Sequence, residues 1–166
     1  MRSDLKWSSN TEYIVKRANK KLWILRRLKL LGADRDDLLD VFFKQVRSIL
    51  EFAAPVWHSS LTGEDRLSIE RIQKSALHII LGQDYNSYRS ALKTTRLESL
   101  FERRRKLCRT FAKKSLSHPK FSKWFKTDRR KPRTRSKVPK FCKVFTRHAR
   151  YERSPLSYLT ALLNQD

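Results

Sequence analysis

Glycine and cysteine are scarce in this chain of 166 residues, which holds three glycines and two cysteines. A β-sandwich or a Rossmann-type fold needs glycine-bearing turns, so the composition argues against both. Cys108 and Cys142 alone cannot form a disulfide framework. Reduced thiols are the rule inside cells, so we expect an intracellular protein of the nucleus or cytoplasm.

Long apolar runs are also absent. The chain has no run of about eighteen apolar residues, so we expect no helix that spans a membrane. The first seven residues lack the apolar core of a signal peptide.

Motifs for catalysis or for metal binding are missing as well. The sequence has no glycine-rich phosphate loop, no Gly-x-Ser-x-Gly elbow and no His-Glu-x-x-His helix. Cys142 and His148 are only a weak match to zinc-ligand spacing. Asp36 and Asp37 favour helix capping over a two-metal site, because no third carboxylate is suitably placed. We therefore predict no catalytic, cofactor-binding or metal-binding residue.

Positive charge is what the chain has in abundance, with a formal net charge of +23. Residues 1–30 carry +7, residues 31–102 carry −2 and residues 103–166 carry +18. A chain with this charge repels itself unless a polyanion is near, so nucleic acid is the leading partner class. An anionic membrane surface is the competing partner, and solvated lysine-rich helix faces are the alternative without a partner.

Apolar residues recur at helical spacing, which predicts an all-α fold, a small helical bundle. Residues Ser8 to Thr11 offer N-caps for a first helix, whose apolar row runs from Ile14 to Leu28 and whose end is Gly32. Lysine and arginine fill much of the remaining surface of this helix. It is a basic amphipathic helix that can lie along a phosphate backbone or simply face water.

Asp34 is the expected cap of a second helix, which has a broad apolar face from Leu38 to Ala53 and should be the most buried. Pro55 should end it, because proline pushes the preceding residue out of the helical region. Val56 and Trp57 then cover one end of the core.

Thr62 and Asp65 form a capping-box pair at the start of a third helix, which should end at Gly82. A short helix is expected over Tyr88–Lys93, and a longer one from about Ser99. The inner face predicted for the longer helix comprises Leu100, Leu107, Cys108 and Phe111.

Phe121, Trp124 and Phe125 favour an aromatic latch on the core, with base stacking by exposed rings as the alternative. Residues 127–150 form a basic, proline-bearing linker that we expect to be flexible. Ser154 and Pro155 then begin a short terminal helix, whose docking is left open. The predicted organisation is a helical domain over 1–126, a linker over 127–150 and a terminal helix over 151–166.

The basic residues of the first helix, of the helix after Ser99 and of the start of the linker are the predicted contacts to nucleic acid. They are Lys16, Arg17, Lys20, Lys21, Arg27, Arg103, Arg104, Arg105, Lys106, Arg109, Lys113, Lys114, Arg129, Arg130 and Lys131.

Several segments together resemble one protein family. These segments are residues 3–7, 18–22, 37–42, 46–58, 70–80, 97–104 and 153–160. In order and spacing they are similar to the part downstream of the polymerase active site in reverse transcriptases of non-LTR retrotransposons, of the jockey and CR1 type. The resemblance implies a thumb and C-terminal helical region that grips the template–primer duplex of an RNA-directed DNA polymerase.

The family's catalytic Tyr-x-Asp-Asp motif and its metal-binding aspartates belong to the palm and have no counterpart in these residues. We therefore expect the chain alone not to polymerise, and to bind RNA, DNA or their hybrid without sequence specificity. The alternatives are a helical protein-interaction module or a non-functional product of a truncated element.

The first sixty or so residues also resemble, more weakly, the N-terminal segment of an AlkB-homologue tRNA methyltransferase. The dioxygenase's iron ligands and the methyltransferase fold are missing from the sequence, so we expect neither activity.

Overall fold

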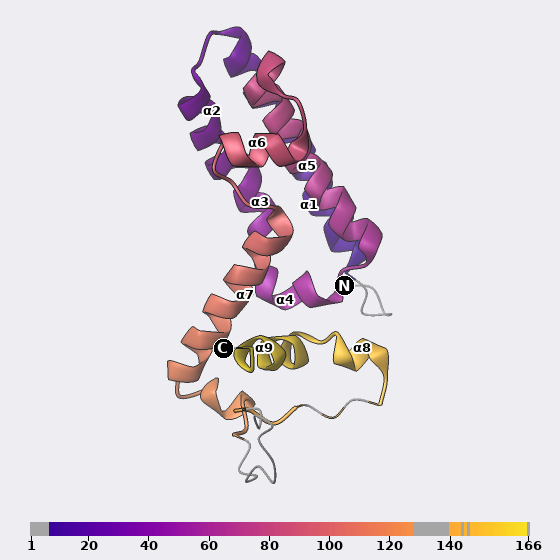
Figure 1. Cartoon of the computed structure of the whole chain (residues 1–166). Coiled ribbons are helices and arrows are strands. Elements are labelled where there is room, and N and C mark those ends of the chain that lie inside the picture. Colours follow the sequence, from indigo (N-terminus) through magenta and orange to yellow (C-terminus); the bar gives the residue numbers. More distant parts are fainter. Residues whose placement is uncertain (1–6, 128–139, 144, 146, 166) are drawn as a thin grey trace. The chain divides into compact units, whose positions relative to one another are not determined.

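The computed structural model describes residues 7–127, 140–143, 145 and 147–165, and its regular elements there are helices (Figure 1). Within these residues no sheet forms, and a single isolated bridge pairs Thr127 with Phe141. The predicted all-α fold is confirmed. None of the helices described is both long and apolar enough to cross a membrane.

The chain divides into two compact units. Unit 1 consists of Met1–Ala54 and Leu61–Arg103, and unit 2 of Pro55–Ser60 and Arg104–Asp166. One boundary therefore falls between Arg103 and Arg104, inside helix α7 (Leu100–Ser117), whereas the sequence interpretation kept residues 1–126 together.

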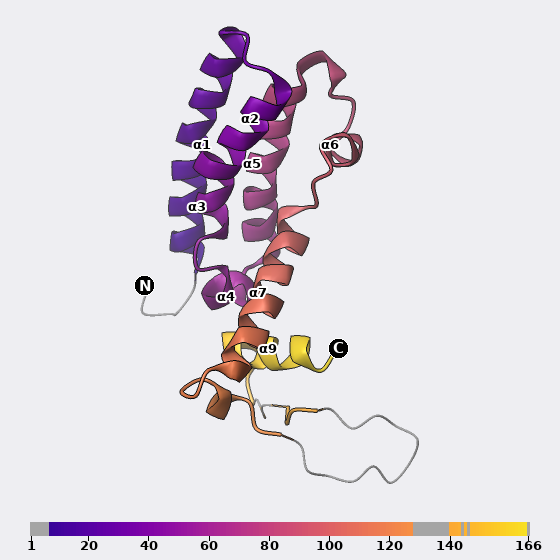
Figure 2. The same cartoon turned by 90° about the vertical axis from the view of Figure 1, so that its left-hand side faces the viewer.

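Unit 1 is built on helical segments that run side by side and are called rows below (Figure 2). Helix α1 (Ser8–Leu30) forms the first row, and α5 (Gly63–Leu81) forms another. The second row, between these two in chain order, is one continuous run of α2 (Arg35–Val41), a π-helical turn (Phe42–Arg47) and α3 (Ser48–Glu51). The short helix α6 (Tyr88–Thr94) packs against α5.

Helix α1 begins without a side-chain cap, so the caps predicted between Ser8 and Thr11 are wrong. Thr11 is instead buried, and its hydroxyl donates to the carbonyl of Trp7 at 3.2 Å. The C-terminus agrees with the prediction. Gly32 adopts φ +84°, its N–H donates to the carbonyl of Lys29, and the N–H of Ala33 donates to that of Leu28. This is the double hydrogen bond of a Schellman motif.

The π-helical turn sets which residues of the second row are buried. The N–H of Ser48 donates to the carbonyl of Phe43, five residues back. Residues spaced by four shift gradually around the surface of a regular α-helix, because each turn holds about 3.6 residues. A π-helical turn holds more residues and shifts them back. The buried residues of the row are spaced by four throughout: Leu38, Phe42, Val46 and Leu50. The fully buried residues form one narrow row, with half-buried Val41 and Ile49 beside it, and the predicted broad face is wrong at exposed Ala53.

The second row ends at Glu51, four residues before the predicted end at Pro55. Phe52 leaves the helical region with ψ 127°, and Ala53 follows in a left-handed conformation with φ +51°. Pro55 lies in the first turn of α4 (Ala54–Trp57), where its missing N–H costs nothing. Trp57 is buried as expected, but Val56 is 47 % exposed and covers no core.

Helix α5 begins and ends as predicted. The N–H of Asp65 donates to the Thr62 hydroxyl at 3.1 Å, and the N–H of Thr62 donates to the Asp65 carboxylate at 3.2 Å. The Asp34 cap of α2 is also confirmed, since its carboxylate accepts from the N–H of Asp37 at 2.8 Å. Gly82, with φ +57°, follows the last residue of α5.

A polar network joins α5 to α6 and to the start of α7, within unit 1. The Tyr88 hydroxyl donates to the Glu70 carboxylate and accepts from the Gln73 amide at 3.0 Å. The Gln73 amide also donates to the carbonyl of Glu98 at 2.9 Å. Glu70 accepts in addition from the N–H of Leu100 at 3.1 Å. A carboxylate of α5 therefore caps α7, where a negative charge suits the helix dipole.

Unit 2 has its core between α7 and α9 (Pro155–Leu163). The core consists of Cys108, Ala112, Phe125, Phe141, Leu159, Leu162 and Leu163. Ser154 caps α9 and Pro155 is its first residue, both as predicted. Asn164 anchors the segment around Phe141, because its amide accepts from the N–H of Phe141 and donates to its carbonyl. The terminal helix thus packs within unit 2.

The aromatic latch forms only in part. Phe125 is buried, Phe121 is half-buried and stacks on His118, and Trp124 is 47 % exposed. Most of the predicted linker, residues 128–139, lies outside the described residues. The short helix α8 (Ala149–Glu152) and α9 follow it.

Candidate nucleic-acid interface

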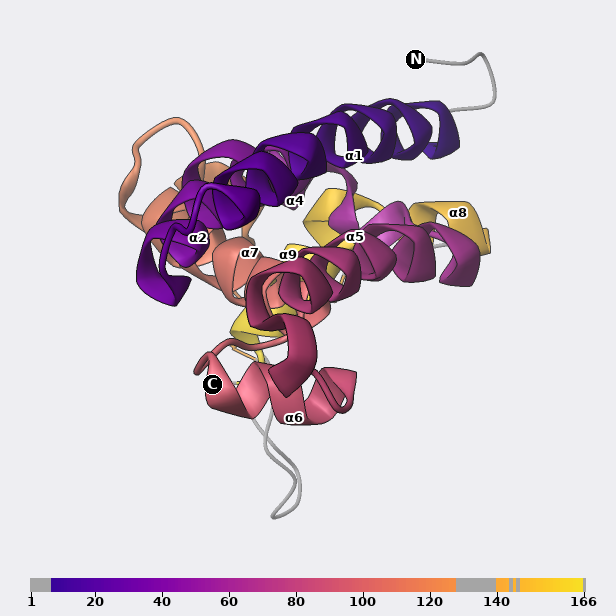
Figure 3. The same cartoon turned by 90° about the horizontal axis from the view of Figure 1, so that it is seen from above.

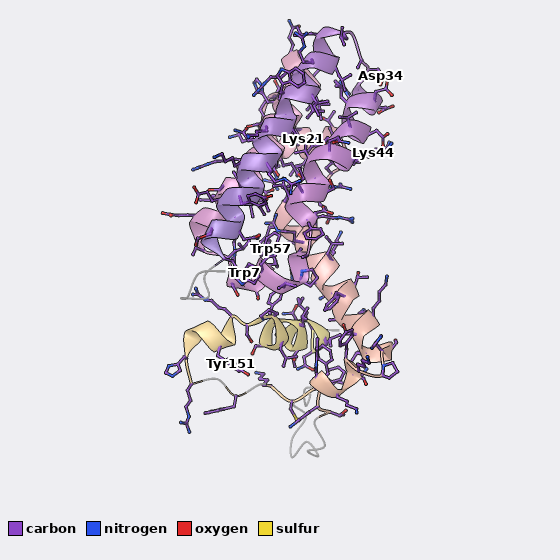
Figure 4. All side chains as sticks on the ribbon, turned by 180° about the vertical axis from the view of Figure 1, so that it is seen from behind. Trp7, Lys21, Asp34, Lys44, Trp57 and Tyr151 are labelled. Atoms are coloured by element: carbon purple, nitrogen blue, oxygen red, sulfur yellow. The ribbon has the colours of Figure 1, made fainter. Side chains whose placement is uncertain are left out.

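Helix α1 presents a row of cations on its outer surface. Ile14, Ala18, Leu22 and Leu25 are buried, which turns the intervening positions outward. Lys16, Arg17, Lys20 and Arg27 are exposed, and Lys21 is half-buried midway along the helix (Figure 4). Within the part of the chain that the structure describes, none of these five forms an ion pair with a carboxylate. Their charge is therefore available to an external anion.

Two exposed aromatic rings lie among these cations. Tyr13 is 58 % exposed and Trp23 is 61 % exposed. The guanidinium of Arg17 lies 5.5 Å from the centre of the Tyr13 ring, and that of Arg27 lies 6.0 Å from the centre of the Trp23 ring. Interleaved cations and exposed rings suit a strand with both phosphates and bases.

Arg103 belongs to unit 1 and forms an ion pair with a carboxylate there. Its Nε lies 3.3 Å from Glu51 Oε1, which also lies 3.3 Å from the Nε of Arg47. Burial, the largest effect, lowers the pKa of Arg47, and the charge of Arg103 also lowers it, whereas the Glu51 carboxylate raises it. Arg103 therefore has a structural role in this group of ion pairs, although its side chain stays 36 % exposed.

Arg104, one of the predicted contacts to nucleic acid, is fully buried in unit 2 and does not lie on the outer surface of its helix. Its Nε donates to His58 Nδ1 at 3.4 Å, and its guanidinium lies 5.7 Å from the centre of the Trp57 ring. His58 is itself buried, with its ring 5.7 Å from that of Tyr158. Arg104 stabilises the interior of unit 2 and is not placed to contact a phosphate.

The burial of Arg104 corrects the inner face of α7 as a whole. The buried row is Leu100, Arg104, Cys108, Ala112 and Ser115. Phe111, which was predicted to face inward, is 38 % exposed, and Leu107 is half-buried. Cys108 is buried as predicted, and burial raises the pKa of its thiol to about 12.

The other predicted contacts on α7 differ in exposure. Lys106, Lys113 and Lys114 are exposed, whereas Arg105 and Arg109 are half-buried. Arg105 donates to the side chain of Gln165 at 3.1 Å. The remaining three predicted contacts, Arg129, Arg130 and Lys131, lie outside the described residues.

The sequence pattern did not indicate one group of polar residues that the structure brings together. Arg26 of α1 and Lys74, Ser75 and His78 of α5 line a hollow of about 330 Å³, together with Ile79 and Tyr85. Lys74 and His78 are four residues apart and so share a face of α5, a spacing visible in the sequence. The nearness of Arg26 depends on the packing of α1 against α5, which the sequence did not provide.

Metal ligation has no visible basis in the described ranges. Among those residues, no three side chains of His, Cys, Asp or Glu come together in a way that can hold an ion.

Comparisons of the chain with protein-family models, with curated proteins and with solved structures found no match.

Proposed function

We propose that this protein binds RNA, DNA or their hybrid without sequence specificity, the part that thumb helices play in the reverse transcriptases it resembles. The observation that carries the proposal is the row of exposed cations on α1, of which Lys16, Lys20 and Arg27 are examples. Contacts to phosphate give affinity without base readout. An intracellular location belongs to the same proposal.

The proposal can be tested by the salt dependence of binding. A labelled RNA–DNA hybrid is titrated with the full chain, and the dissociation constant is measured by fluorescence anisotropy at several salt concentrations. With six to ten phosphate contacts, affinity should fall by about 10³–10⁵ between about 50 and 200 mM salt. No binding at low salt, or binding that salt does not weaken, would refute the proposal and favour a protein-interaction module.

A matched pair of double variants identifies the surface. Lys20→Gln with Arg27→Gln removes two cations from the α1 row. Arg89→Gln with Lys93→Gln removes two exposed cations from α6. The α1 variant should lower the slope of log Kd against log salt by about two, because each lost contact lowers it by about one. The α6 variant should leave the slope unchanged, and equal losses in both variants would contradict the assignment to α1.

A further inference from the structure

The hollow between α1 and α5 has the features of a site for an anion. The two helices pack side by side in unit 1 (Figure 3). The six residues that line it come from α1, from α5 and from the segment just after α5. Its volume of about 330 Å³ lies at the lower end of the range for small-ligand sites.

The charge of the lining is positive. Arg26 and Lys74 are both exposed, and in the described part of the chain neither forms an ion pair with a carboxylate. No Asp or Glu is among the lining residues. Two cations held on neighbouring helices without a counter-ion attract an anion to the space between them.

Neutral donors complete the lining. The Tyr85 hydroxyl is buried and has no hydrogen-bond partner among the described residues. A buried hydroxyl without a partner is costly, and an oxygen-rich ligand would remove that cost. The Ser75 hydroxyl lies in the same lining, and the His78 ring packs 4.9 Å from the Tyr85 ring, which restricts its position.

We propose that this hollow binds one phosphate group of a nucleic-acid strand, an inference that rests on the proposed function. A phosphate has the oxygens to accept from the guanidinium of Arg26, the ammonium of Lys74 and the hydroxyls of Ser75 and Tyr85 together. Arginine binds such oxygens through two parallel N–H groups, and lysine adds a compact charge. Holding one phosphate in this hollow fixes the register of the strand along α1.

The first test uses inorganic phosphate as the probe. Backbone amide NMR signals of the full chain are followed while phosphate replaces chloride at constant ionic strength. Signals around Lys74, His78 and Tyr85 should shift and saturate. The absence of a saturable shift at these residues would overturn the proposal.

Matched variants locate the anion. Lys74→Gln should raise the dissociation constant for phosphate about tenfold, because it removes a charge-assisted hydrogen bond. Arg71→Gln removes an exposed cation from the same helix, outside the lining, and should change the constant less than about twofold. Tyr85→Phe should weaken phosphate binding by a few-fold. Equal effects of Lys74→Gln and Arg71→Gln would overturn the proposal.

The second test asks whether the phosphate belongs to a strand. Lys74→Gln should weaken binding of the hybrid duplex more than Arg71→Gln does. If both variants bind the duplex equally, the proposed function stands but the strand phosphate does not occupy the hollow. If the wild-type chain binds inorganic phosphate but no duplex at low salt, the proposed function fails and the hollow takes a free phosphate instead, which also overturns this inference.

Discussion

Arg104 occupies a core position of α7. The core positions one turn before it and one turn after it hold apolar residues. Leu100 precedes it by four residues and Cys108 follows it by four, and all three are fully buried. Its guanidinium lies against the Trp57 ring and donates to a nitrogen of His58. A planar guanidinium can lie flat against the ring while its Nε donates in the guanidinium plane, whereas lysine has no planar group to pack on the ring.

Arg104→Ala should therefore lower the free energy of unfolding by about 2–4 kcal/mol, the usual cost of emptying a core position. Arg104→Lys should recover little of this loss. The free energy is measured by urea unfolding, with Lys114→Ala, at an exposed position of the same helix, as a control that should change it by about 0.5 kcal/mol or less. A stable Arg104→Ala variant would show that the side chain is dispensable inside unit 2.

Tyr88 provides a prediction about pH. Its pKa is raised above the ordinary value, first by burial and then by the hydrogen bond and the negative charge of Glu70. A group whose pKa is raised in the folded state stabilises the fold below its unfolded pKa, here about 10, and loses that contribution as the pH rises further.

The free energy of unfolding should thus decrease above pH ~10, and one tyrosine should ionise only as unit 1 unfolds. Phenolate absorbance and circular dichroism, followed together through an alkaline titration, measure both events. Tyr88→Phe should remove the coupled step and cost about 1 kcal/mol at neutral pH, because Glu70 and Gln73 lose a partner. Ionisation of every tyrosine before any unfolding would contradict this account.

At the scale of elements, the π-helical turn is equivalent to one extra residue inserted in a regular helix. Removing that residue should return the row to α-helical geometry without moving its two ends. Gln45 is exposed and lies inside the turn, so its side chain contributes nothing to the core.

Deleting Gln45 should consequently cost about 2 kcal/mol or less, and the protein should still unfold cooperatively. Deleting Arg71 from regular α5 is the matched control. It rotates the rest of that helix by about 100° and takes Ala76 and Ile80 out of the core. Thermal unfolding followed by circular dichroism distinguishes the two, and a Gln45 deletion as damaging as the Arg71 deletion would show that the wide turn is required.

The sequence predicts elements well where the deciding contact is local. Asp34, Thr62 and Ser154 each cap a helix through an N–H three residues away, a contact fully specified by nearby residues. The early end of the second row was missed because it depends on the backbone conformations of Phe52 and Ala53, which no local signal marks. The inner face of α7 was missed because an apolar pattern favours Phe111, whereas Arg104 finds its partners 46 residues away at His58.

The part of the candidate interface that lies on one helix was predictable from the sequence, and the part that combines two helices was not. Ile14, Ala18 and Leu22 are buried, so the cations of α1 lie on the outer face of the helix. The hollow lined by Arg26 and Lys74 combines two helices, so it required the packing of α1 on α5.

At the scale of the whole molecule, the exposed cations occur in both units. Lys20 and Arg27 represent unit 1, and Lys113 and Lys114 represent unit 2. If both units contact the same duplex, their contributions to the salt dependence of binding should add, because distant sites contribute independently.

Lys113→Gln with Lys114→Gln should therefore lower the slope of log Kd against log salt by about two, and the quadruple variant that adds Lys20→Gln and Arg27→Gln should lower it by about four. The anisotropy titration described above measures these slopes. A quadruple variant with no smaller slope than the α1 double variant would confine the interface to unit 1.

The cap that Glu70 places on α7 also bears on how the protein is made. Glu70 is 30 residues ahead of Leu100, so the ribosome releases the acceptor well before the helix that it caps. Chains emerge N-terminus first and their early parts fold first. The carboxylate that caps α7 is therefore already part of the emerged chain when Leu100 appears.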